Sequence, residues 1–371
     1  MEKYSAYRDP GTGIQPFLIP VPPFESEFLS KLLAPIGYTV GILRTSIVFV
    51  VWLLYVVLLG FCVILTPIPP LHRLVTGFLT TILARLVLFI VGLPWIPVEP
   101  FTRKRSRGAT IPETWVPRAG DIIVSNWVSW LEILYLAFRF NPTFVVPVSN
   151  SVPPSFVLRD ANVTGRRTGT GSANVPSTRA SVQLPIDGLR TASLLTMIGL
   201  TGHVLPTLKA PAKPRTLEEI RMSSNAPLVV FPECTTSNGR GLLRFANMFS
   251  GSLPIKGYKM FLMCVRYDPP TTWTPTPSLS IPSTTVNPLA HVFKLSCALV
   301  PPSISIRMLA PSESPGAPTF ITSEVSTSAF GEDAVTEVCA TLIAQMGKMK
   351  RVGMGWEDKS QFLGFYREKR R

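Results

Sequence analysis

The feature that most constrains this chain is an apolar stretch near its start. Residues 47–65 contain no charged side chain. As a helix, these 19 residues would span about 28 Å, close to the thickness of the hydrocarbon layer of a membrane. A helix at the surface of a soluble protein needs a polar face, which this stretch lacks. We therefore expect residues 47–65 to insert into a membrane.

A second apolar stretch, residues 74–94, follows a proline-rich break at residues 66–70. It is interrupted by Arg85, and an arginine at the bilayer centre costs about 2.5–3.5 kcal/mol on insertion scales. Snorkelling or a shallow re-entrant path would relieve that cost. The stretches fit either a hairpin in one leaflet or two complete spans. We predict an N-terminal segment at 1–44 and a membrane anchor at 45–97.

The overall charge indicates an anionic partner. Apolar residues make up 46% of the chain, charged residues 16%, and the formal net charge is +14. Basic proteins bind nucleic acid, anionic lipid or anionic small molecules. The sequence has no zinc-finger spacing, helix-turn-helix pattern or basic–aromatic groove, so we expect no nucleic-acid partner. Membrane lipid and acyl-CoA are the expected partners, and nothing in the sequence indicates a protein partner.

The basic cluster at residues 103–107 directly follows the anchor. Positive residues beside a membrane segment usually lie on the cytosolic side, so the rest of the chain should face the cytosol. The five cysteines are scattered and form no Cys-x-x-Cys pair, which fits a reducing compartment and argues against a disulfide framework or a structural zinc site. No metal or bound cofactor is indicated.

From residue 121 the sequence alternates between strand and helix patterns, which predicts an α/β domain. Ser129 and Glu132 have the spacing of a capping box, so Ser129 is the expected helix N-cap. Segments without apolar periodicity are a flexible insertion at about 150–188 and a Pro-rich loop at 268–289. Strands are expected at 121–124, 144–148, 228–231, 260–267 and 303–309, and helices at 129–140, 189–200 and 332–349.

The clearest chemical signal follows the expected strand at 228–231. Residues 231–240 read Phe-Pro-Glu-Cys-Thr-Thr-Ser-Asn-Gly-Arg and enter a polar loop. Hydroxyl groups, backbone N–H groups and an arginine can all hydrogen-bond phosphate oxygens, so the loop is a candidate site for an anionic ligand. The candidate substrate-binding residues here are Glu233, Thr235, Thr236, Ser237 and Arg240.

This run resembles the Phe-Pro-Glu-Gly-Thr-Arg-Ser motif of the glycerolipid acyltransferase family, which acts on lysophosphatidic acid and glycerol phosphate. Upstream, residues 126–132 occupy the place of that family's Asn-His-x-Ser-x-x-Asp motif. Asn126 and Ser129 match, whereas Trp127 stands at the histidine position and Glu132 at the aspartate position. The resemblance covers residues 115–310 and implies a mixed sheet flanked by helices, preceded by a hydrophobic helical hairpin. It is greatest to fungal lysophosphatidic acid:oleoyl-CoA acyltransferases.

The resemblance implies acyl transfer from a CoA thioester to a glycerolipid hydroxyl, with acyl-CoA as co-substrate. In the family the histidine removes the hydroxyl proton and the aspartate orients it. Trp127 cannot replace that histidine because its indole N–H is only a donor. The catalytic candidates are therefore Glu132, Ser129 and His203, while Asn126 and Trp127 join the substrate-binding candidates.

A second departure concerns the phosphate contact. The family's motif arginine is Thr236 here, so a bidentate phosphate contact is lost. Arg240 is the candidate replacement for it. Cys234 stands where the family has glycine, and as a lone thiol it is not expected to act as a nucleophile.

Two functions from different classes follow. The first is a membrane-bound acyltransferase acting on lysophosphatidic acid or a related lysophospholipid, at the endoplasmic reticulum or lipid droplets. The second is a catalytically inactive protein of the same fold that binds lipid or acyl-CoA there.

Residues 311–371 are expected to form a C-terminal helical region.

Overall fold

The computed structural model describes residues 4–23, 28–103, 113–151, 183–207, 214–249, 255, 257–318, 320 and 333–368. Most of the predicted insertion at 150–188, and all of the basic cluster except Arg103, lie outside these ranges.

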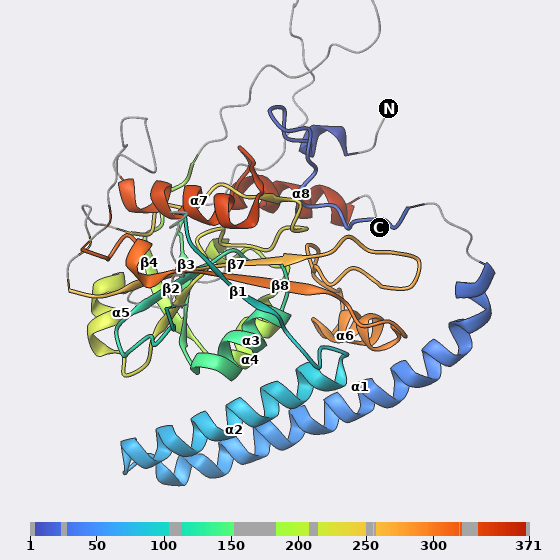
Figure 1. Cartoon of the computed structure of the whole chain (residues 1–371), viewed down its shortest axis with the longest axis horizontal. Coiled ribbons are helices and arrows are strands. Elements are labelled where there is room, and N and C mark those ends of the chain that lie inside the picture. Colours follow the sequence, from blue (N-terminus) through green and yellow to red (C-terminus); the bar gives the residue numbers. More distant parts are fainter. Residues whose placement is uncertain are drawn as a thin grey trace, which may run out of the picture.

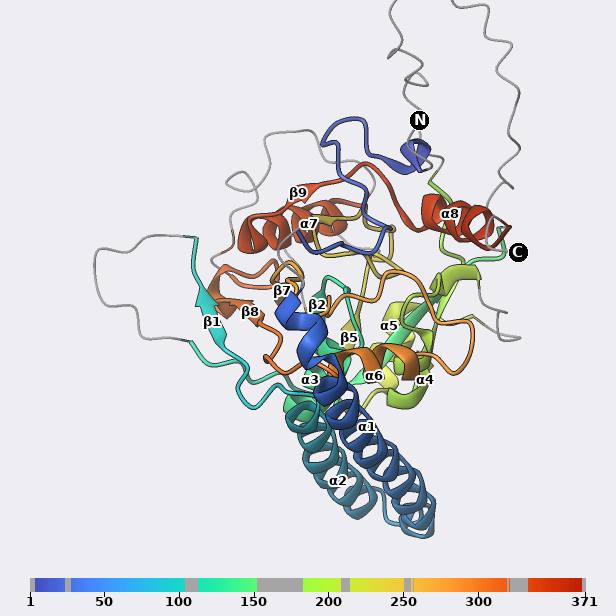
Figure 2. The ribbon, with the colours of Figure 1, turned by 90° about the vertical axis from the view of Figure 1, so that its right-hand side faces the viewer.

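Two long helices form an N-terminal hairpin. Helix α1 (Phe28–Cys62) and helix α2 (Pro69–Ile90) are joined by a short 3₁₀ turn, η2 (Val63–Leu65). Both are long and apolar enough to cross a membrane, judged by length and composition. They lie side by side and antiparallel beneath the rest of the molecule (Figure 1, Figure 2). The first helix begins well before residue 47, and Pro69 starts the second, where its missing N–H leaves no bond unmade.

Two arginines of the hairpin contact residues outside it. Arg85 donates to the carbonyl oxygens of Leu93 and Pro94, and its guanidinium lies 5.5 Å from the centre of the Phe138 ring. Arg44 donates to the carbonyl oxygen of Ala298 at 2.9 Å. Arg85 therefore has protein partners for its charge at the end of α2.

A seven-stranded mixed sheet forms the centre of the globular part, and its strand order is β1-β8-β7-β2-β5-β3-β4. Five strands confirm the sequence prediction to within one or two residues at each end. Two strands, β1 and β4, were not predicted. The strands are β1 (Val98–Phe101), β2 (Ile122–Ser125), β3 (Thr143–Val148), β4 (Gly188–Ala192), β5 (Leu228–Val230), β7 (Met260–Tyr267) and β8 (Ile304–Leu309).

The predicted helix at 189–200 is wrong in its first half. Residues 188–192 pair antiparallel with β3, with Leu189 opposite Pro147, and helix α4 begins only at Leu194. Strand pairing satisfies this backbone better than a helix would, because β3 otherwise has a free edge.

Helices cover both faces of the sheet, which confirms the predicted α/β fold (Figure 1). Alternate residues of β2 point to opposite faces: Ile122 and Val124 join one core with α7, and Ile123 joins another with α3 and α2. The helices are α3 (Leu131–Phe140), α4 (Leu194–Leu200), α5 (Leu217–Ser223), α6 (Leu289–Ser296), α7 (Ala334–Gly347) and α8 (Trp356–Glu368), and the short strands β6 (Gly241–Leu242) and β9 (Lys350–Arg351) pair with each other.

The topology fixes where polar loop residues gather. Strands β2 and β5 are parallel neighbours, with Ile122 opposite Leu228. Their carboxyl ends therefore lie at the same edge of the sheet, where α/β proteins usually place their ligand sites. Asn126 directly follows β2, and Phe231 directly follows β5.

Candidate functional site

The turn after β2 and the loop after β5 are in direct contact. The backbone N–H of Trp127 donates to Glu233 Oε1 at 2.8 Å, and the backbone N–H of Ser237 donates to the Trp127 carbonyl at 3.1 Å. Residues that are about a hundred positions apart in the sequence thus form one compact polar cluster.

Glu233 connects three chain segments. Its second carboxylate oxygen accepts the backbone N–H of Leu243 at 3.0 Å. The side chain is only 1% exposed, and burial raises its pKa to about 8, opposed by both backbone hydrogen bonds and by the charge of Lys359. With both oxygens occupied, Glu233 holds the two motif segments together.

Asn126 is engaged by the neighbouring strand. Its Nδ2 donates to the Val265 carbonyl at 2.9 Å, and its Oδ1 accepts the Val265 N–H at 2.7 Å. The amide therefore closes a two-bond clamp on β7, and in this state it holds the end of β2 in place.

Trp127 and Ser129 lie inside the protein. The Trp127 ring is fully buried, stacks on Phe231 with 5.2 Å between ring centres, and donates its indole N–H to the Ser129 carbonyl. The expected N-cap role of Ser129 is wrong: α3 begins at Leu131, and Trp130 occupies the N-cap without a side-chain bond. The Ser129 hydroxyl is buried near Tyr267, and among the described residues it has no hydrogen-bond partner within normal range.

Glu132 satisfies the start of α3 instead. Its Oε1 accepts the backbone N–H groups of Ser129 at 2.6 Å and Val128 at 2.5 Å, and its Oε2 accepts the hydroxyl of Tyr267. Burial raises its pKa to about 7, opposed first by the Tyr267 hydrogen bond. A carboxyl group with that pKa is suited to act as a general base near neutral pH.

The hydroxyl groups of the loop after β5 are bonded within the protein. Thr235 Oγ1 donates to the His203 carbonyl at 2.8 Å, and Thr236 Oγ1 donates to the Leu279 carbonyl at 2.6 Å. Ser237 Oγ accepts the N–H of Gly239 at 3.2 Å. Arg240 is exposed, and within the described ranges its side chain makes no hydrogen bond to the other candidate residues.

Cys234 has a backbone conformation that favours glycine, with φ at +57°. This gives a physical reason for the glycine at that position of the motif that the loop resembles. Burial raises the thiol pKa well above its usual value, so Cys234 is an unreactive thiol.

His203 reaches the loop through its backbone. Its half-buried imidazole lies near Arg367 and Lys359, and its pKa is lowered by burial and by those two charges. In the described part of the chain, no hydrogen bond joins the imidazole to Glu132 or Glu233. The structure therefore gives His203 no direct contact with either carboxylate.

The prediction from the sequence did not include one charged residue of the cluster. Lys359 of α8 is fully buried, and its Nζ donates to the carbonyl oxygen of Thr236 at 2.6 Å and to its Oγ1 at 3.1 Å. Burial lowers its pKa well below the usual value, opposed by Glu233. A signal was present: Trp356, Lys359 and Phe362 fall on one helical face, so the lysine sits on an otherwise apolar stripe.

An apolar cavity of about 280 Å³ lies beside the motif turn, between the hairpin and α3, α4 and α6. Trp130, two residues from Glu132, forms part of its wall. The indole N–H of Trp130 donates to His291 Nδ1 at 2.9 Å, and His291 Nε2 faces the Thr276 carbonyl at 3.1 Å. The cavity suits an apolar ligand because carbon side chains form most of its lining.

Comparison with known proteins gives one informative relative. The chain is 23% identical over 366 residues to a Schizosaccharomyces pombe protein named "Putative lysophosphatidic acid:oleoyl-CoA acyltransferase", and the match covers 98% of this chain and 97% of the relative. The similarity therefore extends over the hairpin and the globular part alike. No family model and no solved structure matches the chain.

Proposed function

We propose that this protein is a membrane-bound, acyl-CoA-dependent acyltransferase that acylates lysophosphatidic acid or a related lysophospholipid. The observation that carries the proposal is the position of the apolar cavity. It lies between the hydrophobic hairpin and the motif turn, with Trp130 in its wall and Glu132 two residues further on. A long acyl chain in this cavity would have its reactive end close to the turn.

The name of the fission-yeast relative supports the choice of substrates. That protein is named for lysophosphatidic acid and oleoyl-CoA, and this chain matches it over nearly its whole length. Both molecules join an apolar chain to phosphate groups, which fits a cavity lined by carbon and a protein with a net charge of +14. We place the protein at the endoplasmic reticulum membrane or lipid droplets, with the globular part in the cytosol.

The chemistry needs a base other than histidine, and we assign that role to Glu132. In its ionised form it would accept the proton of the lysophospholipid hydroxyl while that oxygen attacks the thioester carbonyl. The new bond is the ester C–O bond, the bond that breaks is the thioester C–S bond, and the CoA thiolate leaves and takes up a proton. Tyr267, which donates to Glu132 Oε2, would hold the carboxylate in place.

Access to Glu132 requires the Pro-rich loop at 268–289 to move. This loop covers the motif: the Leu279 N–H donates to the Val128 carbonyl at 2.9 Å, and its carbonyl accepts from Thr236 Oγ1. Two hydrogen bonds of this kind contribute about 1–3 kcal/mol in total, which is within reach of substrate binding.

The experiment is turnover by the purified protein in phosphatidylcholine nanodiscs, with labelled oleoyl-CoA and lysophosphatidic acid. We expect phosphatidic acid from the wild type and a loss of at least a hundredfold in the Glu132→Gln variant. Gln keeps an acceptor oxygen for the Ser129 and Val128 N–H groups, so folding should survive, and thermal unfolding checks that it does. If wild type forms no more phosphatidic acid than an empty nanodisc does, the proposal is wrong.

A second candidate is a non-catalytic lipid- or acyl-CoA-binding protein of the same fold. The specific observation in its favour is that Trp127 replaces the base and is stacked in the core, while Glu233 uses both its oxygens inside the protein. Saturable binding of oleoyl-CoA without any product, unchanged in the Glu132→Gln variant, would establish this function in place of the first.

A further inference from the structure

Helix α8 places the amino group of one lysine in the loop after β5. Lys359 is fully buried, and its Nζ contacts both the carbonyl oxygen and the hydroxyl of Thr236. Among the described residues, no other lysine or arginine side chain hydrogen-bonds residues 233–237. The charge of Lys359 is also close enough to Glu233 and His203 to lower the pKa of both groups.

Lys359 contacts the residue that occupies the arginine position of the motif. Thr236 stands where the motif that this loop resembles carries its arginine. The sequence has lost the cation there, and the fold brings one back from a helix 123 residues further along the chain. An isolated buried charge is expensive, so an apolar residue would be the simpler choice if α8 needed only to be packed.

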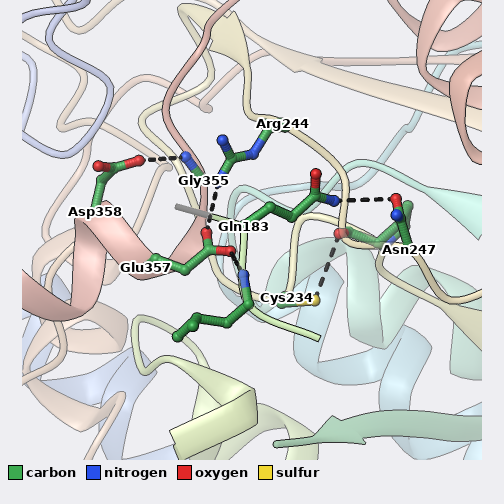
Figure 3. A network of polar contacts seen from close by, with 9 residues as sticks. Gln183, Cys234, Arg244, Asn247, Gly355, Glu357 and Asp358 are labelled. Atoms are coloured by element: carbon green, nitrogen blue, oxygen red, sulfur yellow. Dashed lines mark hydrogen bonds and ion pairs between the residues drawn. The ribbon is translucent and has the colours of Figure 1, made fainter. Parts of the chain in front are cut away.

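The helix that carries Lys359 is firmly held. Glu357 accepts from Arg244 Nη2 and from the backbone N–H of Leu184, each at 3.0 Å, and Asp358 accepts the N–H of Gly355 at 2.8 Å (Figure 3). Trp356 and Phe362 anchor the same helix in the core. These contacts fix the ammonium group relative to the loop, as recognition of a small anion requires.

The ammonium group has one N–H donor that is not used on Thr236. A lysine has three N–H donors, and two of them are used on Thr236. Within the described ranges the third has no hydrogen-bond partner. A phosphate oxygen that reached the loop would complete the set with a charge-assisted hydrogen bond.

We propose that Lys359 is the cation with which this protein recognises the phosphate group of its ligand. The shared chemistry is a phosphate monoester, carried by lysophosphatidic acid and, as a second source, by the 3′-phosphate of CoA. The inference rests on the proposed function for the identity of the ligand and deepens it by assigning the phosphate contact. Besides burial, the charges of the exposed Arg367 and of Lys359 both lower the pKa of the half-buried His203, so the two basic side chains belong to one electropositive region.

The test measures binding, so it does not depend on turnover. Wild type, Lys359→Gln and Lys359→Arg proteins in phosphatidylcholine nanodiscs are titrated with oleoyl-lysophosphatidic acid, monooleoylglycerol and oleoyl-CoA. Gln keeps a donor for Thr236 without the charge. We expect wild type to bind lysophosphatidic acid about 10- to 100-fold more tightly than monooleoylglycerol, Lys359→Gln to lose that preference, and Lys359→Arg to keep it. The exposed Lys350 serves as the matched control, and Lys350→Gln should bind like wild type.

The outcomes separate the sources and the alternatives. Weaker binding of oleoyl-CoA alone would assign Lys359 to the CoA phosphate, and weaker binding of lysophosphatidic acid would assign it to the acceptor. A folded Lys359→Gln variant that keeps its full preference for both phosphate ligands would overturn the inference. If Lys359→Gln does not fold, the Thr236→Arg, Lys359→Gln double variant moves the cation into the loop and must recover the preference. A phosphate-selective protein without turnover would refute the proposed enzyme and leave this inference standing.

Discussion

The motif cluster and the neighbouring cavity are built in opposite ways. The cluster is polar, and its hydrogen-bonding groups are almost all used within the protein, as Asn126 is by Val265 and Glu233 by Trp127 and Leu243. The cavity is apolar, and it borders the hydrophobic hairpin. Trp130 belongs to both.

The difference shows how the roles of these residues are divided. Asn126, Trp127 and Glu233 hold the fold together. Glu132 also bonds the start of α3, and Glu132 and Lys359 are the buried ionisable groups to which we assign the chemistry. A chain can therefore retain most residues of a motif for structural reasons, while its chemistry depends on only a few of them.

The division is tested most strongly at Glu233. The Glu233→Ala variant leaves the backbone N–H groups of Trp127 and Leu243 buried without acceptors, so we expect a loss of about 2–6 kcal/mol in the free energy of unfolding. Glu233→Gln keeps one acceptor oxygen and should lose clearly less. Urea denaturation in detergent micelles measures both. Equal small losses would mean that Glu233 is not structural.

The two raised carboxyl pKa values predict a pH dependence of stability. Glu132 and Glu233 have folded-state pKa values of about 7 and about 8, above the unfolded value of 4.5. At these two groups the folded state therefore binds more protons than the unfolded state between pH 4.5 and 8, so their contribution to stability is greatest at the acidic end and falls as pH rises. The pKa of His291, lowered by burial to about 4, acts in the opposite direction up to about pH 6.5. The slope should reach up to about 1.4 kcal/mol per pH unit for each group.

Thermal unfolding between pH 5 and pH 8 measures this dependence. The Glu132→Gln, Glu233→Gln double variant should show a markedly flatter profile. A double variant whose melting temperature depends on pH as the wild type's does would contradict the assignment of these two groups as the buried carboxyls that titrate.

On the cavity side, Gly199 is the most informative position. It lines the cavity from α4, and a Cβ added there would meet no atom within 4 Å. Gly199→Leu should therefore leave the fold intact and weaken oleoyl-CoA binding at least tenfold, measured as a reduced ligand-induced rise in melting temperature. Gly60→Leu, on the exposed side of α1, is the matched control and should bind normally. Equal binding by both variants would show that the acyl chain lies elsewhere.

The smallest effect concerns Cys234. Because its φ is positive, Cys234→Gly should be more stable than Cys234→Ala by about 1 kcal/mol, the reverse of the usual order of glycine and alanine. Comparing the two variants with each other removes the contribution of the lost sulfur. Greater stability of the alanine variant would mean that this loop is not strained.

The sequence predicted the strands that are buried runs, such as β5 and β7, because a continuous apolar run bounded by polar residues has few other structures. It missed β1, a four-residue edge strand that contains Pro100. It took β4 for part of a helix because Leu189 was joined to the apolar run of α4. Only the free edge of β3 decides that pairing, and a local pattern does not contain that information.

For the site, the sequence predicted which segments matter but not what each side chain does. The spacing of the two motifs does not reveal that the Asn126 amide pairs with Val265, 139 residues away. Lys359 was missed because α8 is rich in charged residues and its buried stripe is short. Hydrogen-bond partners distant in the sequence are set by the completed fold, so they become visible only in three dimensions.

The most direct test of the account is the dependence of turnover on acyl-chain length. Wild type and Gly199→Leu are given lysophosphatidic acid with either oleoyl-CoA or decanoyl-CoA, and phosphatidic acid is measured. If motif turn and cavity form one active site, wild type turns over oleoyl-CoA, and the variant loses that activity while retaining decanoyl transfer. Absence of product in wild type, or equal loss of both activities in the variant, would contradict it.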